Sequence, residues 1–415
     1  MIDIGGKIIA DLHIHSRFSR ACSKNINFDN LVKWAQIKGI NLLGTGDFTH
    51  PLWFKEINDE LDDGGKGIYF HKKTGFPFLI TGEISLIYTQ GSGRRIHLVL
   101  LVPSILIAEK INAYLDKKGR RDYDGRPIFK IPCGEFVKEM MNISPEIEII
   151  PAHIWTPWFG LFGSNSGFDS LAECFRDQIK NIHAIETGMS SDPRMNWRVK
   201  ELITNNISIV SFSDAHSFWP FRLGREATIF ERVESYSDLI NQIRENKFLG
   251  TIEVDPAYGK YHWDGHRACN FFANPEETKK LNGICPKCKK NLTVGVEYRV
   301  EELAKNPKDF VPKNAKPYFL ILPLHEIISL CYNLNLESKK TWIIYDELIK
   351  KFGNEFNILI NVSENELINQ NIDDKLAKLI LKNRFGKISV NPGYDGVYGT
   401  AILPQEKTEK QGKLS

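Results

Sequence analysis

Long apolar runs are missing from this sequence of 415 residues. No stretch is long enough to cross a bilayer, so a membrane-spanning protein is not expected. The N-terminus leads directly into the first predicted strand, without the pattern of a signal peptide. Cysteine is also scarce, with seven in the chain. Their odd number and irregular spacing do not fit a disulfide framework. We therefore expect a cytoplasmic protein with reduced thiols.

A strong excess of charge of one sign is missing as well. The formal net charge is +3, with 25% charged and 42% hydrophobic residues. These values are typical of a globular protein with a sizeable core, and the length allows two or three domains. Such a mild charge permits a nucleic-acid partner through local patches but does not predict one by itself.

What the sequence does contain is a set of short apolar runs that end in ionisable residues. The first is the segment ADLHIHS, in which Asp11 is followed by His13 and His15. Alternate residues of a strand point the same way, so both imidazoles should face one side at the strand's end. An isolated pair of this kind is more often a surface feature, but six further runs repeat the pattern. Those runs lead to Asp47 with His50, Glu83, His97, His153, Glu186, and Asp214 with His216.

Seven short apolar strands separated mostly by helix-sized segments predict an α/β fold. Parallel strands of a closed barrel show this pattern, and their functional site lies at the C-terminal ends of the strands. The first connecting helix is marked by Phe28, Leu31, Trp34 and Ala35 at helical spacing, with Gly39 as its stop. We expect the barrel to span residues 1–250.

The strand ends bring nine candidate metal ligands to the barrel mouth. They are His13, His15, Asp47, His50, Glu83, His97, His153, Asp214 and His216. Nine ligands are too many for one ion, so two or three ions with a bridging carboxylate are predicted. Histidine-rich ligand sets favour zinc, manganese or iron over magnesium. We expect zinc, with Mn²⁺ or Mg²⁺ as alternatives. Clustered ions activate water and clamp phosphate, so the pattern predicts metal-assisted phosphoester hydrolysis.

A second metal site is predicted in residues 251–300. Cys285 and Cys288 form a Cys-x-x-Cys pair, and Cys269 is the remaining cysteine of this segment. His266 precedes Cys269 by three residues and would complete a Cys3His zinc site, with His262 as the alternative fourth ligand. A chance pair of cysteines is the less favoured alternative, because the segment is short, polar and rich in loops.

The remaining residues, 301–415, are expected to form a C-terminal α+β domain. Apolar spacing predicts helices over 324–334 and 342–352, followed by the strand-and-turn stretch GKISVNPGYDGVYGTAIL. The last residues, EKTEKQGKLS, are typical of a disordered tail. This tail lacks the adjacent aromatic pair of a clamp-binding peptide, so a sliding-clamp partner is left open.

An aromatic loop follows His153. Trp155, Trp158, Phe159 and Phe162 crowd into a Gly/Ser-rich segment beside the predicted metal site. Such rings can stack on a ligand base, but they more often pack a loop onto the protein.

The motifs around the strand ends resemble those of the polymerase-and-histidinol-phosphatase (PHP) superfamily. The resemblance implies a distorted (β/α)7 barrel with three metal ions. The implied ligand groups are His13, His15, Glu83 and Asp214 for one ion, Glu83, His97 and His153 for the second, and His216 with the Asp47/His50 element for the third. The sequence departs from the superfamily at Arg20-Ala21-Cys22, where many members have a further histidine, and in the spacing of Asp47 and His50.

Longer strings resemble the endonuclease Q family over nearly the whole chain. They include ADLHIHSRFSRACSKN, GTGDFTHPLW, PAHIWTPWFG, ETGMSSDPRMNW, YHWDGHRAC, CPKCKKNLTVGVEYRVEELA and NPGYDGVYG. Members of this family are DNA-repair endonucleases that nick on the 5′ side of deaminated bases (uracil, hypoxanthine, xanthine) and abasic sites. The resemblance implies a PHP barrel, a small zinc domain and a C-terminal domain, with damaged DNA as the partner.

This function implies roles for particular side chains. As catalytic residues we expect Asp214, Glu83, His13 and His15, with Asp214 able to accept a proton from the attacking water. The expected DNA contacts are Arg17, Arg194 and Arg198 to phosphates, and Trp155 and Trp158 to bases. One alternative is a phosphatase for a small phosphomonoester, which would have no use for a zinc unit. The other is a non-catalytic DNA-binding protein, which would not keep so full a set of ligands.

Overall fold

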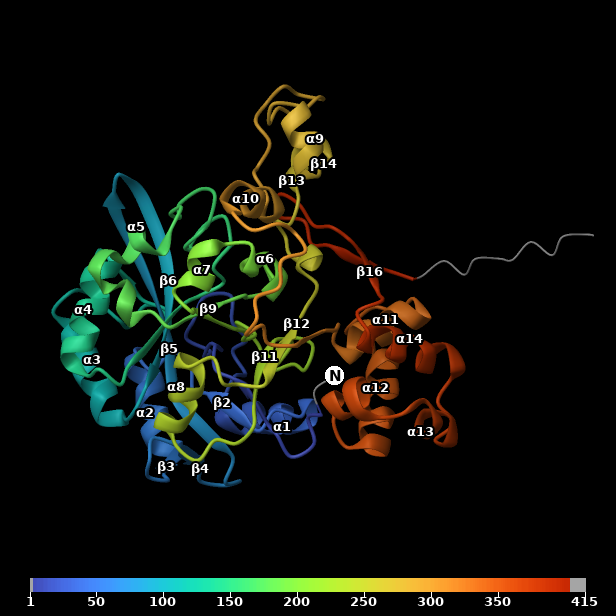
Figure 1. The fold of residues 1–415 in the computed structure, drawn as a ribbon. Helices are drawn as coiled ribbons and strands as arrows, with labels where there is room; N and C mark the ends of the chain where they lie inside the picture. Colours follow the sequence, from blue (N-terminus) through green and yellow to red (C-terminus); the bar gives the residue numbers. More distant parts are fainter. Residues whose placement is uncertain (1–2, 404–415) are drawn as a thin grey trace, which may run out of the picture.

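The computed structural model describes residues 3–403 and has a mixed α/β fold (Figure 1). The predicted disordered tail lies outside the described residues. Figure 1 shows a rounded body of strands and helices, a small unit that projects from it, and a helical part that contains α11 to α14. In residues 3–403 no helix is both long enough and apolar enough to span a membrane.

Short strands form the centre of the body. They are β1 (Ile8–Asp11), β2 (Leu42–Gly44), β5 (Pro77–Gln90), β6 (Ser92–Val102), β8 (Glu148–Pro151), β9 (Ala184–Glu186), β10 (Ser208–Val210), β11 (Ala227–Phe230) and β12 (Gly250–Glu253). β1, β2 and β5 run parallel, as do β9 and β10, which pair with each other apart from the main sheet. β3 (Leu61–Asp63), β4 (Tyr69–His71) and β7 (Ile128–Phe129) extend the main sheet.

The prediction that the strands are all parallel is wrong for β6 and β11. β6 returns antiparallel to β5, with Glu83 opposite Val99 and Ser85 opposite His97. β11 is antiparallel to β1 and to β12. Glu83 and His97 therefore lie within long strands rather than at their C-terminal ends.

The strands enclose a common apolar interior. Alternate side chains of each strand point into it, and the inward set includes Ala10, Leu42, Leu79, Val99, Ile150, Ala184, Val210 and Phe230. α8 (Tyr236–Arg244) packs Leu239, Ile240 and Ile243 into the same cluster. We call this group of strands the barrel, although β9 and β10 pair apart from the main sheet and no closed hydrogen-bonded ring forms among the described residues.

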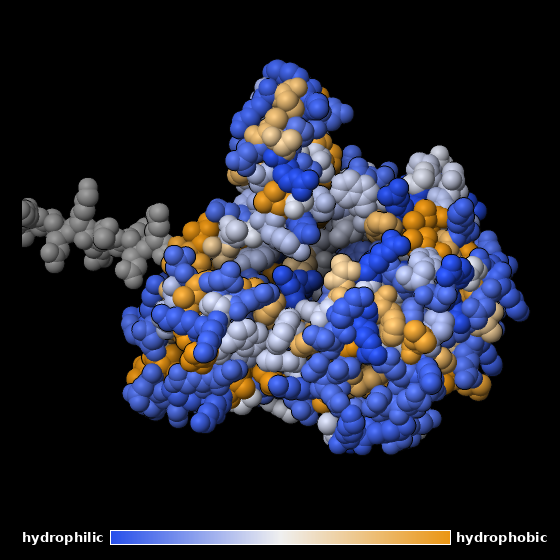
Figure 2. Space-filling view, turned by 180° about the vertical axis from the view of Figure 1, so that it is seen from behind, coloured by the Kyte–Doolittle hydropathy of each residue, from blue (hydrophilic) through white to orange (hydrophobic). Residues whose placement is uncertain are grey.

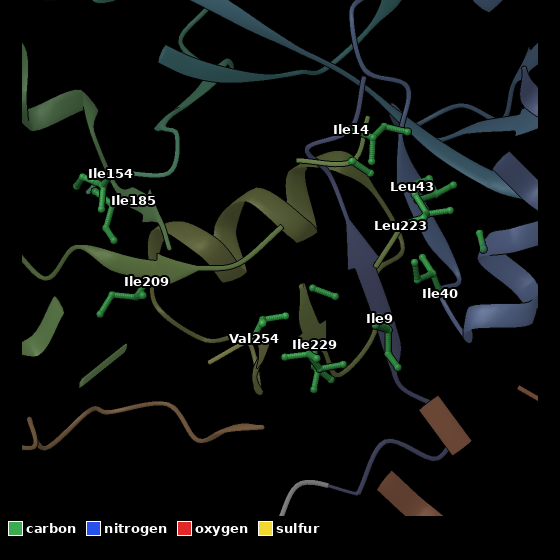
Figure 3. Packing of buried hydrophobic residues seen from close by; sticks show 14 of the residues in the cluster. Ile9, Ile14, Ile40, Leu43, Ile154, Ile185, Ile209, Leu223, Ile229 and Val254 are labelled. Carbon is green, nitrogen blue, oxygen red and sulfur yellow. The ribbon is translucent and has the colours of Figure 1, made fainter. Parts of the chain in front are cut away.

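The opposite faces of the strands form a second, larger cluster together with the helices. Figure 3 shows part of it, with Ile9 of β1 near its register partner Ile229 of β11. The predicted first helix is confirmed as α1 (Phe28–Lys38), which ends at Gly39 in a left-handed conformation. The other helices of the body are α2 (Pro51–Glu60), α3 (Ile105–Asp116), α4 (Cys133–Ile143), α5 (Leu171–Phe175), α6 (Pro193–Trp197) and α7 (Lys200–Thr204).

The projecting unit lies between β12 and β15 (Tyr318–Leu320) in the chain. It contains β13 (Asp264–His266), β14 (Phe271–Ala273), α9 (Pro275–Lys280) and α10 (Val296–Leu303). Figure 2 shows it standing out from the body, with a mostly hydrophilic surface. β12 and β15 pair with each other in the main sheet. The expected boundary at residue 250 therefore falls at a barrel strand, and the C-terminal region contributes a strand to the barrel sheet.

The C-terminal region is mainly helical. Both predicted helices are confirmed, as α11 (Leu324–Tyr332) and α12 (Lys339–Phe352). α13 (Glu364–Asn369) and α14 (Asp374–Arg384) follow, and the chain then forms the hairpin of β16 (Ser389–Asn391) and β17 (Thr400–Ile402).

Candidate metal centre

The segment that carries His13 and His15 is tied to the loop that carries Asp214. The buried carboxylate of Asp11, at the end of β1, accepts hydrogen bonds from Ser213 N–H (3.0 Å) and Gly224 N–H (2.9 Å). Two residues after His13, the N–H of His15 donates to the carbonyl oxygen of Ala215 (2.9 Å). Strand β1 and the loop after β10 therefore approach each other at the barrel mouth.

The first group of candidate ligands is His13, His15, Glu83 and Asp214, whose ligand atoms lie within 4.8 Å of one another. His15 Nε2 is 3.0 Å from Asp214 Oδ1 and 3.3 Å from Glu83 Oε2. His13 Nε2 is 3.6 Å from the same two oxygens. These are the residues predicted for the first ion.

The second group is Glu83, His97 and His153. Glu83 Oε1 lies 2.8 Å from His97 Nδ1 and 3.2 Å from His153 Nε2. One carboxylate thus presents Oε2 to the first group and Oε1 to the second. This is the arrangement required of a bridging ligand between two ions, and it matches the prediction for the second ion.

Outer hydrogen bonds orient the imidazoles. His13 Nδ1 lies 2.8 Å from Glu186 Oε1, and His15 Nδ1 lies 2.9 Å from Asp47 Oδ1. Each contact leaves the Nε2 lone pair facing the cluster, as is usual for histidine ligands of metals. Glu186 Oε2 also accepts the backbone N–H of His153 (2.8 Å), so this carboxylate supports both groups.

The chemistry of the pocket fits metal ions. His13 Nε2 is buried and has no hydrogen-bond partner within the described part of the chain, which is costly unless a cation binds there. Burial disfavours the charged form of Glu83, but His97, Arg126 and His13 around it hold its pKa well below the usual value. A bound cation would displace the protons from these imidazoles, so the centre can supply anionic oxygens and imidazole lone pairs together, which suit zinc, manganese or iron.

Strained backbone accompanies these residues. Asp47, His153 and Asp214 have φ angles of +44°, +30° and +48°, in the left-handed region that non-glycine residues rarely adopt. Such strain concentrates at functional sites, where the surrounding structure holds it in place. In each case the turn follows a strand, namely β2 for Asp47, β8 for His153 and β10 for Asp214.

The predicted third group does not come together in residues 3–403, so the prediction that Asp47 and His50 bind an ion is not supported. Both oxygens of Asp47 are taken, by His15 and by the N–H and hydroxyl of Ser16. His50 stacks on Phe18 with ring centroids 4.3 Å apart. His216 lies at the rim, its ring 4.6 Å from that of His15, outside both ligand groups.

The projecting unit holds a separate group of candidate ligands. His266, Cys269, Cys285 and Cys288 lie within 4.8 Å of one another, and His266 Nδ1 is 3.5 Å from Cys288 Sγ. Three thiols and one imidazole fit a tetrahedral structural zinc site. His262, the alternative fourth ligand, is not part of this group.

The predicted DNA contacts have different surroundings. Trp155 is fully buried and its indole N–H donates to Asn196 Oδ1 (2.8 Å), so its prediction as a base contact is wrong. Trp158 is 37% exposed and its ring lies 5.3 Å from that of Tyr261. Trp158 alone of the two tryptophans has a free face for stacking.

The arginines differ in the same way. Arg198 makes two hydrogen bonds to Glu301 (2.9 and 3.1 Å), and Arg17 is paired with Glu56. Both guanidinium groups are therefore engaged within the chain, and their contact with phosphate stays a prediction. Arg194 is exposed at the start of α6 and stays a candidate.

Three side chains beside the ligands were not chosen as site residues in the sequence analysis. Arg126 Nη1 donates to Glu83 Oε2 (3.0 Å), and Arg225 Nε donates to the carbonyl oxygen of Ser213 (3.1 Å). Both lie in segments that connect strands and helices, where strand alternation and helical period do not apply. Glu186 did end a predicted strand, so its position alone could have indicated a supporting role.

A cavity of about 240 Å³ opens beside Asp214. Its walls include Thr156, Tyr261, His262 and Tyr398. The candidate metal centre is thus open to a ligand on the side that faces the projecting unit.

Comparisons with known proteins give consistent results. The family model of the MJ0043 C-terminal domain matches residues 323–387. The uncharacterized protein MJ0043 of Methanocaldococcus jannaschii is 36% identical over 264 residues, which are 61% of this chain and 32% of that protein. The uncharacterized protein YqxK of Bacillus subtilis is 28% identical over 417 residues, covering 95% of this chain and 98% of that protein. The chain spans about a third of MJ0043 but nearly all of YqxK.

Two solved structures match over almost the full length. The lesion-specific endonuclease PfuEndoQ from Pyrococcus furiosus has a TM-score of 0.85 and 29% identity, covering 99% of each chain. An endonuclease Q in complex with a 27-mer duplex substrate, with an abasic lesion at the active site, has a TM-score of 0.85 and 30% identity. That match covers 96% of this chain and 97% of the other. The resemblance found in the motifs is confirmed, and the chain belongs to the endonuclease Q family.

Proposed function

We propose that this protein is a metal-dependent DNA-repair endonuclease that hydrolyses the phosphodiester on the 5′ side of deaminated bases and abasic sites. The observation that carries the proposal is the pair of ligand groups that share Glu83 at the barrel mouth. An endonuclease Q with 30% identity has been captured on a duplex with an abasic lesion, which supports damaged DNA as the partner. We further assign the barrel to the PHP type.

The two groups would hold two ions with Glu83 between them, and zinc is the ion expected. When bound, such ions supply an activated water and neutralise charge on the scissile phosphate. Asp214, which is a quarter exposed, is the carboxylate best placed to accept a proton at the mouth. Arg126 is partly exposed beside Glu83, so its remaining N–H groups can bind a phosphate oxygen.

The cavity beside Asp214 supports a flipped nucleotide as the substrate. A base inside a duplex cannot reach a recessed metal centre unless it leaves the stack. The cavity of about 240 Å³ borders Asp214 and has aromatic walls, which suits an unstacked base. The Cys3His site would keep the projecting unit folded next to this cavity.

Nicking of defined duplexes tests the proposal. Duplexes with a single uracil, hypoxanthine, xanthine or abasic site, and an undamaged control, are incubated with the protein and the product ends are mapped. We expect one cut on the 5′ side of the lesion, abolished by chelator and restored by metal. Cutting of undamaged DNA at the same rate would contradict the proposal. Hydrolysis of a fluorogenic phosphomonoester without nicking would favour the phosphatase alternative.

A further inference from the structure

The motif NPGYDGVYG, residues 391–399, joins β16 to β17 and docks on the projecting unit. The ring of Tyr394 lies 4.8 Å from that of Phe272. The carboxylate of Asp395 accepts hydrogen bonds from the N–H of Arg267 (2.6 Å) and the hydroxyl of Thr293 (2.8 Å). One side of the turn is therefore fixed to the zinc-binding unit.

The other side of the turn is fixed to the segment that leaves the barrel after β12. The N–H of Gly396 donates to Lys260 O (2.9 Å), and the N–H of Gly399 donates to Tyr258 O (3.1 Å). A Cβ atom at Gly399 would lie 2.1 Å from the carbonyl oxygen of Ala257, so only glycine allows this approach. The turn thus has a defined position between the barrel and the zinc-binding unit.

This position brings Tyr398 to the barrel mouth. Tyr398 is 48% exposed, although its neighbours Val397 and Gly399 are more buried. Lys260 Nζ lies 4.6 Å from the centre of its ring. The other face of the ring is available to a second planar or cationic group.

Tyr398 borders two cavities. One is the cavity of about 240 Å³ that reaches Asp214. The other, of about 730 Å³, lies between the barrel mouth and α11 and is bordered by Arg222 and Arg225. Met189 and Tyr398 line both cavities, so they stand at the junction between the two.

We propose that Tyr398 is a stacking residue of the DNA site, which separates the nucleotide at the metal centre from the next nucleotide of the same strand. The next nucleotide would enter the larger cavity, where two arginines match a phosphate and Leu330 and Leu334 offer apolar surface. The inference rests on the proposed function, because it needs a lesion strand at the metal centre. It assigns a specificity role to a motif that the metal centre does not use.

The chemistry requires only the ring of Tyr398. Stacking on an aromatic side chain tolerates any base, so Tyr398 would hold the strand without reading its sequence. Undamaged duplex keeps its bases stacked on one another and would gain little from the tyrosine. Tyr398 should therefore contribute to lesion binding more than to binding of plain duplex.

The test compares Tyr398→Ala, Tyr398→Phe and the control Phe385→Ala. Phe385 is 55% exposed and also lies near a lysine, Lys387, but it borders neither cavity. Affinity is measured for duplexes with one uracil and an uncleavable methylphosphonate on its 5′ side. We expect Tyr398→Ala to weaken binding about 10-fold or more, and Tyr398→Phe and Phe385→Ala to change it by less than about twofold.

A second substitution, in the DNA, ties the effect to the neighbouring nucleotide. A thymine next to the uracil is replaced by 5,6-dihydrothymine, which keeps its pairing edge but stacks poorly. The change is made on either side of the uracil in turn. On the side whose base stacks on Tyr398, it should weaken binding to the wild-type protein and have no effect on binding to the Tyr398→Ala variant.

If dihydrothymine on each side of the uracil lowers the affinity of wild type and of Tyr398→Ala equally, the role of Tyr398 is overturned. Binding of lesion duplex without nicking would contradict the proposed activity and still leave these affinities to decide the role of the tyrosine. Failure to prefer lesion duplex over plain duplex would overturn both.

Discussion

Glu83 is the residue on which the metal centre depends most. Its two oxygens face different ligand groups, with His15 on one side and His97 on the other. Glu83→Gln replaces one oxygen by an amide nitrogen that cannot bind a cation. We expect nicking to fall by more than about 100-fold, since even outer partners of metal ligands typically contribute 10–100-fold.

Asp214→Asn should have the same effect, while both variants bind lesion duplex nearly as well as wild type. Nicking rate, metal content and affinity are measured together. Near wild-type cutting with unchanged metal content in either variant would rule out its role as a ligand.

A second group of buried carboxyls, Glu226 and Glu253, belongs to neither ligand group of the metal centre. Ser211 Oγ lies 3.1 Å from Glu226 Oε2, 3.0 Å from Glu253 Oε2 and 2.8 Å from Thr187 Oγ1. Thr187 Oγ1 is in turn 2.9 Å from Glu253 Oε2. Two hydroxyl protons cannot serve all these oxygen–oxygen contacts at once, which favours a proton on one of the two carboxyls.

These carboxyls predict a pH dependence of stability. Burial raises the pKa of Glu226 from 4.5 to about 8, and that of Glu253 also rises. The folded protein then keeps a proton that the unfolded chain releases above pH 4.5. The free energy of unfolding should therefore fall as pH rises from about 4.5 to about 8, by up to about 1.4 kcal/mol per pH unit for Glu226.

Urea unfolding of the metal-saturated protein at pH 5.5 and pH 8 measures the slope of the free energy of unfolding against pH. Glu226→Gln keeps the shape of the acid and cannot ionise, so its slope should be smaller than that of wild type. Identical slopes in both proteins would contradict the prediction.

At the scale of elements, the loop after His153 divides its aromatic residues between packing and recognition. Trp158→Ala should lower the ratio of lesion to plain duplex affinity by about one to two orders of magnitude, because a stacked base contributes about 1–3 kcal/mol. Trp155→Ala should instead lower the free energy of unfolding by about 3–5 kcal/mol, since Trp155 is fully buried. An unchanged affinity ratio in Trp158→Ala would mean that this ring only packs against Tyr261.

The zinc-binding unit is the second element with a defined test. Cys285→Ser should lose one bound zinc per chain and weaken DNA binding, while the barrel stays folded. Zinc supplies most of the folding free energy of so small a unit. His266→Ala should lose the same zinc and His262→Ala should keep it, because only His266 lies within 4.8 Å of the three thiols. The opposite result would assign the fourth ligand to His262.

At the scale of the whole molecule, a buried ion pair joins the barrel to the C-terminal helices. Lys38 Nζ, at the end of α1, lies 2.6 Å from Glu355 Oε1 and 2.7 Å from the carbonyl oxygen of Pro220. The hydroxyl of Tyr345 donates to the other oxygen of Glu355 (2.9 Å). Pro220 comes shortly after Asp214 in the chain. The hydrogen bond from Lys38 therefore also links the C-terminal region to the segment that carries this ligand.

Removing one partner of this pair should be costly. Glu355→Ala leaves the ammonium of Lys38 buried without its partner, which typically lowers stability by about 3–5 kcal/mol. The double variant Lys38→Met, Glu355→Leu should be more stable than the single variant, because no charge stays buried. Chemical denaturation followed by circular dichroism and tryptophan fluorescence measures both, and equal stability of the two variants would contradict the role of the pair.

The sequence by itself determined the parts of this protein that depend on local pattern. The apolar strands with histidine and carboxylate residues near their ends indicated a metal centre, and Cys285 and Cys288 indicated a zinc site. Helix α1 followed from the spacing of Phe28 and Leu31 and from the stop at Gly39. These features are encoded within a few residues, where strand alternation, helical period and ligand spacing apply.

Only the tertiary structure decided which polar groups meet. Asp47 and Asp214 look alike in the sequence, yet Asp47 supports His15 while Asp214 joins the ligands, because their turns direct the carboxylates differently. Arg126 and Tyr398 reach the mouth from distant segments with no local signal. Whether a side chain binds, supports or only packs depends on distances of about 1 Å between residues far apart in the chain, and packing of the whole molecule sets those distances.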